Sequence, residues 1–69
     1  MDLKEMGELI QLRREFLNLR QEDLAELSKI TIKTIHLIEL GKGNPAFGTL
    51  QKLSEVLGLD LVLKIKELN

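Results

Sequence analysis

The chain has 69 residues, 43% of them hydrophobic and 30% charged, which suits one domain with an apolar core and is too apolar for a disordered segment. It contains no cysteine and a single histidine, so a disulfide framework and a metal site built from Cys or His are excluded. Ten basic and eleven acidic residues give a net charge of −1, so a nucleic-acid-binding role requires the fold to place positive charge on one face.

The cellular location is predicted from two sequence signals. No apolar run approaches the roughly 18 residues that a membrane-spanning helix needs. The first five residues alternate in charge and lack the apolar stretch of a signal peptide. We therefore expect a soluble, cytoplasmic protein with no membrane partner.

Two helices are expected in the first half of the chain. Apolar residues at three- and four-residue steps predict a helix over residues 3–17, and Asn18 is expected to end it in the left-handed conformation. Residues 21–28 predict a short second helix, because acidic residues occupy its first turn, where the helix dipole favours them. Its expected inner side consists of Leu24, Ala25, Leu27 and Ser28.

Two further helices are expected in the second half. Thr31 is a candidate N-cap for a helix that runs to Leu40, and Gly41 stops that helix. A loop of helix-breaking residues leads to a fourth helix over residues 47–57, which ends at Gly58. Its expected inner side consists of Phe47, Leu50, Leu53, Val56 and Leu57. The predicted fold is therefore mainly α, with four helices.

Residues 59–69 have a different pattern. Four apolar residues alternate with mostly polar ones, which is the period of a strand with one buried face; they are Leu59, Leu61, Leu63 and Ile65. A helix remains an alternative for this segment. A helical body over residues 1–58 offers a single strand no partner, so we expect it to pair with the same strand of a second subunit and form a homodimer.

Residues 21–28 and 31–40 have the spacing of a helix-turn-helix motif, in which two short helices are joined by a three-residue turn. Ala25 supplies the small residue where the two helices cross. Ile35 and Ile38 are expected to pack against the first two helices. Lys29 occupies the turn position that takes a positive φ, where glycine is usual, at a cost of about 1 kcal/mol.

The sequence also resembles a known family. The matching residues are Gln21 to Leu27, Ile30, Thr31, Thr34, Ile35, Ile38, Glu39, Gly41 to Pro45, Thr49, Leu50, Leu53 and Val56 to Leu59. In this register the chain resembles the phage-repressor/Cro-type (XRE) helix-turn-helix family over residues 9–59. The strand-like segment further resembles HipB-like antitoxins, in which strands of two subunits pair.

The resemblance implies roles for individual residues. Base contacts are implied for the N-cap and outer side of the third helix: Thr31, Ile32, Lys33, His36 and Leu37. Phosphate contacts are implied for Arg20, Gln21, Lys42 and Asn44, with Arg13 as a further candidate. A core ion pair is implied between Arg14 and Glu39, since a buried arginine needs a bidentate carboxylate.

Each of these roles has an alternative. Ile32, Leu37 and the neighbouring Leu40 either contact thymine methyl groups or cover the core edge or a protein interface. Lys33, His36 and Lys42 could instead be solvated side chains, and Arg14 and Glu39 could be unrelated surface charges.

The function implied by the resemblance is a DNA-binding transcriptional repressor that acts on a palindromic operator as a homodimer, is nucleoid-associated and needs no cofactor. The HipB-like features imply an antitoxin that represses its own operon and binds a HipA-like kinase toxin. A free-standing phage-type repressor and a protein-interaction module without DNA binding are the alternatives. An enzyme is not expected, because the scattered serines and single histidine lack a triad partner.

Overall fold

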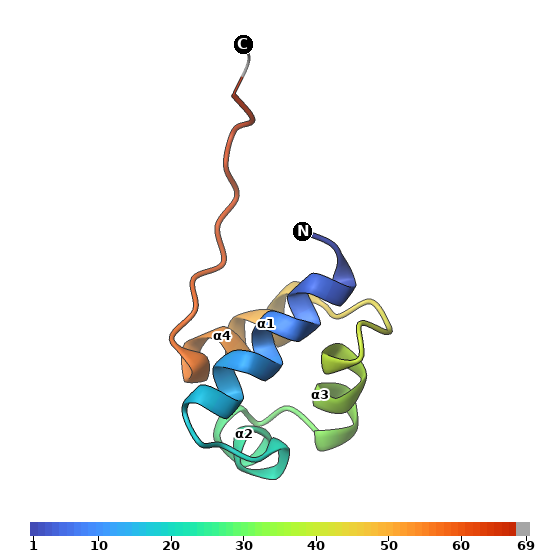
Figure 1. Cartoon of the computed structure of the whole chain (residues 1–69), viewed down its shortest axis with the longest axis vertical. Coiled ribbons are helices and arrows are strands. Elements are labelled where there is room, and N and C mark those ends of the chain that lie inside the picture. Colours follow the sequence, from blue (N-terminus) through green and yellow to red (C-terminus); the bar gives the residue numbers. More distant parts are fainter. Residues whose placement is uncertain (68–69) are drawn as a thin grey trace.

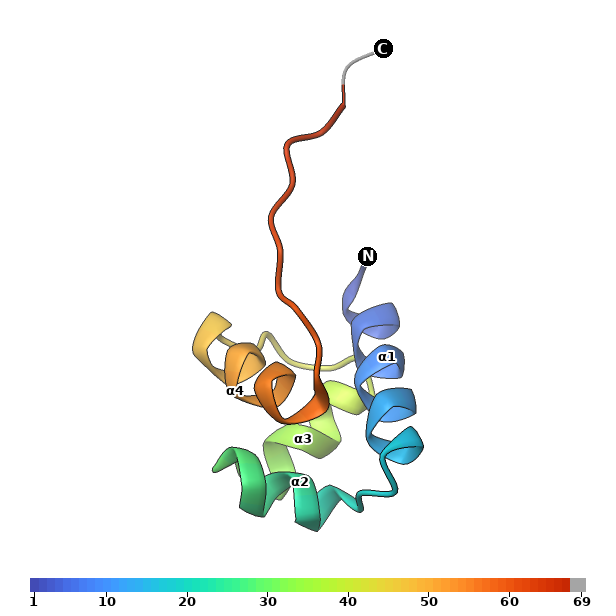
Figure 2. The same cartoon turned by 90° about the vertical axis from the view of Figure 1, so that its left-hand side faces the viewer.

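The computed structural model describes residues 1–67 and contains four helices: α1 (Leu3–Phe16), α2 (Gln21–Ser28), α3 (Ile32–Glu39) and α4 (Phe47–Leu57). In Figures 1 and 2 they gather into one helical body, with α2 and α3 consecutive in the chain and crossing steeply. The predicted mainly α fold with four helices is confirmed, and each helix begins and ends within one residue of its expected bounds. Within residues 1–67, no helix is both long and apolar enough to cross a membrane.

The helices end where local signals predict. Thr31 caps α3, since its hydroxyl accepts a hydrogen bond from the backbone N–H of Thr34 at 3.3 Å. Asn18 and Lys29 have φ values of 58° and 63°, so both expected left-handed positions are confirmed. Asp2, which the sequence analysis did not single out, caps α1 by accepting from the N–H of Glu5 at 2.8 Å.

The core lies among the four helices, each of which contributes to it. It is formed by six buried aliphatic side chains, namely Ile10, Leu24, Ile35, Ile38, Leu53 and Leu57. Full burial of such a side chain contributes about 1.5–3 kcal/mol, so these residues provide most of the stabilisation. Two expected inner residues were wrong: Leu27 and Phe47 are 58% and 66% exposed. The apolar periodicity of each helix covers more of its surface than the neighbouring helices bury.

Gly7 allows α1 to pack directly on the end of α3. A Cβ atom at this position would overlap the backbone carbonyl oxygen of Ile38 and lie 3.1 Å from that of Glu39. Gly41, just after α3, is equally close, since its added Cβ would lie 2.9 Å from the Cα of Lys4. The two glycines therefore fix the C-terminal end of α3 against the first turns of α1.

Residues 59–67, called the tail below, extend away from the helical body in both views (Figures 1 and 2). The strand expected over residues 59–69 is not formed in the described part of that segment, and neither is the alternative helix. Residues 68 and 69 lie outside the described residues. The physical reason is that a strand requires a hydrogen-bonded neighbour, and the all-helical body offers none.

Candidate nucleic-acid interface

Helix α3 has an inner and an outer face. Ile35, Ile38 and Glu39 are buried against the other helices. The exposed side chains are Ile32, Lys33, His36, Leu37 and Leu40, which together with the exposed N-cap Thr31 include every residue with an implied base contact. Because the helical repeat is 3.6 residues, burial of one face leaves this set on the other. We call it the outer face of α3.

The segment from Leu27 to Ser54 carries positive charge without an exposed carboxylate. Its cationic residues are Lys29, Lys33, Lys42 and Lys52, all exposed, and Glu39 is its single acidic residue. Glu39 is buried and paired with an arginine, so it contributes no negative charge at the surface. The net charge of the whole chain hides this pattern, because acidic residues outside the segment offset its positive charge. The protein is therefore acidic overall, whereas the segment that contains α3 and its flanking loops is cationic.

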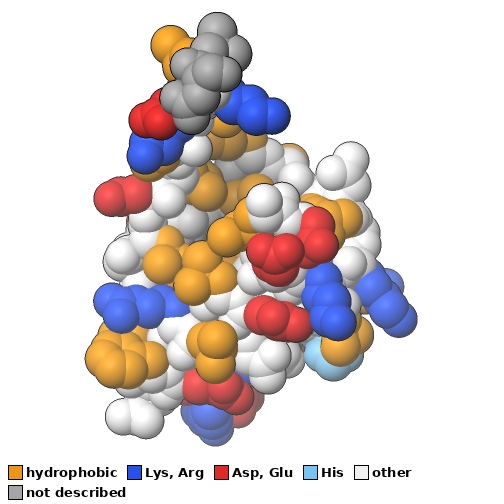
Figure 3. Space-filling view, turned by 45° about the horizontal axis from the view of Figure 1, so that its top comes forward, with side chains coloured by type: hydrophobic (Ala, Val, Ile, Leu, Met, Phe, Trp, Pro, Cys, Tyr) orange, Lys and Arg blue, Asp and Glu red, His pale blue; other side chains and the backbone are white. Residues whose placement is uncertain are grey.

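The other charged side chains are more mixed. Figure 3 looks onto the end of the molecule from which the tail rises, where blue and red side chains lie close together around a hydrophobic area. In the part of the chain that the structure describes, no three His, Asp or Glu side chains are grouped so that they could hold a metal ion.

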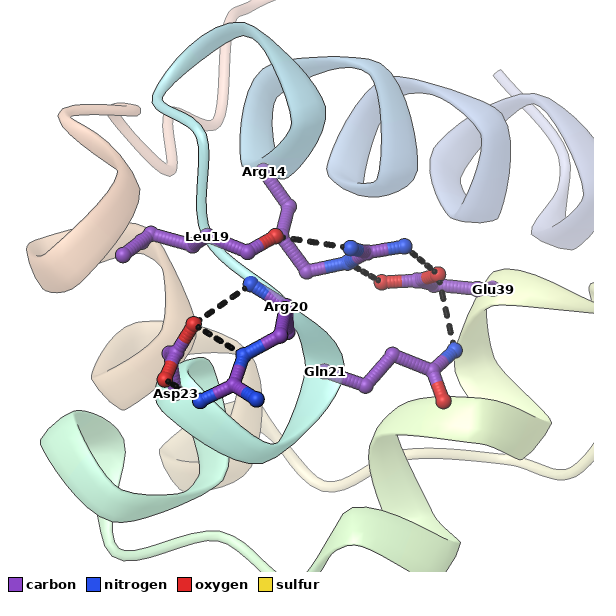
Figure 4. Close-up of polar contacts among 6 residues, drawn as sticks. All are labelled: Arg14, Leu19, Arg20, Gln21, Asp23 and Glu39. Atoms are coloured by element: carbon purple, nitrogen blue, oxygen red, sulfur yellow. Dashed lines mark hydrogen bonds and ion pairs between the residues drawn. The ribbon is translucent and has the colours of Figure 1, made fainter.

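Arg14 and Glu39 form a buried, bidentate ion pair that joins α1 to α3 (Figure 4). The Nε and Nη2 atoms of Arg14 donate to the two carboxylate oxygens at 2.7 and 2.9 Å, and Nη1 donates to the carbonyl of Leu19 at 2.8 Å. The hydrogen bond to Glu39 raises the pKa of Arg14, although burial acts in the opposite direction. Arg14 thus stays charged, and the pair fixes how α3 sits on α1.

Gln21, the first residue of α2, is attached to this ion pair. Its side-chain Nε2 donates to Oε1 of Glu39 at 3.0 Å, and Figure 4 shows the amide turned toward the carboxylate. The amide nitrogen carries two hydrogens, so one remains for another acceptor. The N-terminus of α2 is thereby held against the C-terminal end of α3.

Arg20 is engaged by two carboxylates that the sequence analysis did not assign to the site. Its Nε and Nη2 donate to Asp23 at 3.1 and 3.0 Å, and its Nη1 lies 2.7 Å from Oε1 of Glu22. Asp23 also accepts from the backbone N–H of Arg20 at 2.8 Å. These bonds raise the pKa of Arg20 and lower the pKa of Asp23, so both stay charged. The sequence signal for this pairing was the close spacing of Glu22 and Asp23 to Arg20.

The loop after α3 brings two further residues to the outer face. A shallow hollow of about 170 Å³ lies between α3 and this loop, and it is lined by Thr34, Leu37, Ile38, Lys42, Gly43, Asn44 and Pro45. Lys42 and Asn44, both implied phosphate contacts, therefore lie beside Leu37 of α3.

Arg13 is placed differently from the other implied phosphate contacts. Its Nε donates to the carbonyl of Leu57 at 2.7 Å, and its guanidinium lies 5.1 Å from the centre of the Phe16 ring. Arg13 thus satisfies a carbonyl at the C-terminal end of α4, where a positive charge suits the helix dipole. The structure associates this side chain with α4 and not with the outer face of α3.

Comparison with known proteins agrees with this geometry. Residues 10–64 match the helix-turn-helix family model, and this range includes α2, α3, the loop and α4. No curated protein matches the sequence. The family is one of DNA-binding regulators and is generally non-enzymatic. Because the match spans most of the chain, the protein belongs to the XRE-type helix-turn-helix family of DNA-binding regulators.

Proposed function

We propose that this protein is a transcriptional repressor that binds a double-stranded DNA operator as a homodimer and blocks access to a promoter. The observation that carries the proposal is the outer face of α3, which is exposed, presents Lys33 and His36, and contains no carboxylate. An α-helix fits the major groove of B-form DNA, where base edges can be distinguished. Two such helices in a dimer would read two half-sites about one helical turn apart.

The outer face of α3 supplies suitable groups for base recognition. Lys33 can donate to the acceptor edge of guanine, and His36 can donate or accept. Ile32 and Leu37 suit the methyl group of thymine, and their exposed fractions of 49% and 38% leave them accessible. Thr31 is exposed at the N-terminus of α3, the end at which a recognition helix meets base edges.

Phosphate binding is assigned to residues that flank α3. Lys42 and Asn44 lie on the loop beside it, and Gln21 stands at the N-terminus of α2 with one amide hydrogen free. The N-terminal turn of a helix attracts anions through its open N–H groups and its dipole. Such contacts give affinity for any duplex and no base preference.

The experiment that tests this function compares two lysines. Lys33→Ala should cost about 1–3 kcal/mol on the preferred operator and relax choice at one base position, because it removes a base contact. Lys42→Ala should weaken binding to all duplexes together and reduce the salt slope by about 1. Both are measured by fluorescence anisotropy over a salt series, on an operator chosen by selection from random DNA.

Lys64→Ala in the tail is the matched control, since it removes the same charge far along the chain and should leave binding to all duplexes unchanged. Equal losses from Lys33→Ala on every sequence would reassign Lys33 to the phosphate backbone. A parent protein that retards no duplex at low salt would refute DNA binding altogether, because even non-specific binding depends on phosphate contacts.

Dimerisation is assigned to the tail. Its side chains Leu63 and Ile65 are 101% and 97% exposed, which is unfavourable for aliphatic residues in water. A groove of about 360 Å³ opens at the foot of the tail, where Figure 3 shows hydrophobic side chains gathered, and its apolar lining includes Met6, Leu9, Leu50 and Leu61. Pairing of two tails would satisfy both backbones and cover these surfaces.

The more specific proposal is an antitoxin that represses its own operon together with a HipA-like kinase toxin. Its support is the resemblance of the alternating apolar tail to HipB-like proteins. Identification of the neighbouring gene tests it, followed by co-purification of both products. A neighbouring gene unrelated to kinases would favour a free-standing phage-type repressor.

A protein-interaction module without DNA binding is the second candidate. It is favoured by three exposed aliphatic residues on the outer face of α3, namely Ile32, Leu37 and Leu40. Gel retardation of random duplex DNA at low salt distinguishes the two functions: a DNA-binding regulator retards any duplex through phosphate contacts, whereas an interaction module retards none.

A further inference from the structure

Arg20 is the cation nearest to the N-terminus of α2, yet it is already paired within the chain. Three of its N–H groups are directed at carboxylates, two at Asp23 and one at Glu22 (Figure 4 shows the pair with Asp23). The Arg20 and Glu22 side chains are 73% and 61% exposed, so these bonds face water. A phosphate that approaches this end of α2 therefore meets a guanidinium whose charge is balanced by two carboxylates.

The Arg20 side chain does not cap α2. Arg20 occupies the N-cap position of α2, but a guanidinium has only donors and cannot accept a hydrogen bond from the N–H groups of the first turn. Asp23, in contrast, folds back onto the backbone N–H of Arg20 at 2.8 Å. The arrangement keeps the first turn of α2 open to an anion while two carboxylates hold the nearest cation.

We propose that Glu22 and Asp23 are affinity-setting residues, which hold Arg20 in an intramolecular ion-pair cluster that a DNA phosphate must displace. This inference rests on the proposed DNA-binding function and assigns a role to residues that make no contact with bases. The carboxylates compete directly with phosphate for Arg20. Their effect is the same on every duplex, because each duplex has the same phosphates. Choice of sequence is then left to the outer face of α3.

The cluster can be opened without disturbing the helix. Asp23→Asn removes the charge and retains a side-chain oxygen that can accept the hydrogen bond from the N–H of Arg20. Glu22→Gln removes the second charge and touches no capping bond. Glu26→Gln is the matched control, since it removes an exposed carboxylate from the same helix one turn further on.

The test is a mutant cycle measured by fluorescence anisotropy on an operator and on a random duplex. The combination of Glu22→Gln and Asp23→Asn should bind both duplexes about threefold to tenfold more tightly at moderate salt, as expected when exposed ion pairs no longer compete. Its salt slope should be steeper by about 1, because Arg20 then releases a counterion from DNA. In the Arg20→Ala background the same two substitutions should change affinity less than about twofold. Thermal melts followed by circular dichroism establish that every variant is folded.

The outcomes separate the inference from the function on which it rests. An unchanged or weaker affinity of the double variant would overturn the inference and show that the carboxylates position Arg20. An equal gain from Glu26→Gln, or a gain that persists with Arg20→Ala, would overturn it in favour of a general charge effect. A parent protein that binds neither duplex would overturn the proposed function itself.

Discussion

The helical body (residues 3–57) and the tail (residues 59–67) contain similar aliphatic side chains but differ in what surrounds them. Leu24, Leu53 and Leu57 are completely buried in the body, whereas Leu63 and Ile65 in the tail are fully exposed. Within residues 1–67, every buried side-chain nitrogen and oxygen also has a hydrogen-bond partner. The body therefore contains the partners that it needs, while Leu63 and Ile65 of the tail have no covering surface within the described residues.

Removal of the carboxylate of Glu39 is expected to have the largest effect on the body. Glu39→Ala leaves the buried charge of Arg14 without a carboxylate partner, which typically costs about 3–5 kcal/mol. A domain of this size rarely has more than about 3–5 kcal/mol of stability, so we expect the variant to be largely unfolded at 25 °C. Circular dichroism with urea titration measures the loss.

The matched control removes both charges. Arg14→Leu combined with Glu39→Leu leaves no buried charge unpaired, and should recover much of the lost stability. If Glu39→Ala melts at the temperature of the parent protein, the ion pair contributes nothing and the body is held together by apolar packing alone.

Gly7→Ala should lower the free energy of unfolding by an intermediate amount, although a change from glycine to alanine usually stabilises a helix. Alanine is favoured over glycine in a helix by roughly 0.5–1 kcal/mol, so the change would stabilise an open position. At Gly7 the added methyl group meets the backbone of α3, and overpacking typically costs about 1–3 kcal/mol. Gly48→Ala in α4 is the control, because an added Cβ there meets nothing within 4 Å. Stabilisation by both substitutions would disprove the close approach of α1 and α3.

Leu63→Lys should have the smallest effect on the stability of the body and a large effect on association. The side chain is fully exposed in the single chain, so its replacement breaks no internal contact. We expect sedimentation equilibrium to show a monomer, or a much weaker dimer, together with poor operator affinity. Lys64→Glu, which changes charge on the opposite side of the alternating pattern, should leave the dimer intact. A Leu63→Lys dimer as tight as the parent would place the subunit contact on the helices.

Much of the helical body could be predicted because its signals are local. Thr31 caps α3 with its own side chain, and Gly58 ends α4 in the left-handed conformation, so neighbouring residues decide these boundaries. The role of Gly7 could not be predicted, because it depends on the carbonyl of Ile38, which is distant in the sequence. The strand predicted for residues 59–69 is not formed in the described part of that segment, because apolar alternation indicates a strand only where a neighbouring strand can pair with it.

The candidate site was predictable to a similar degree. Helical periodicity and family register together identified the exposed outer face of α3. They did not show that Gln21 is tied to Glu39 or that Arg20 is paired with Asp23, because side-chain bonds of this kind depend on rotamers and on the folded backbone. Arg13 illustrates the same limit, since its position in α1 is compatible with DNA but its hydrogen bond is to α4.

The bonds around Glu39 have a consequence for how the molecule opens and closes. One carboxylate receives hydrogen bonds from Arg14 of α1 and from Gln21 of α2, while its own backbone ends α3. Separation of α3 from α1 would break the ion pair, and separation of α2 from α3 would remove a hydrogen bond from the same carboxylate, so we expect α2 and α3 to open together. We expect their slowest-exchanging amide hydrogens to exchange at a common rate, as a single cooperative unit. The two helices would then meet a duplex as one rigid body, with little conformational entropy left to lose.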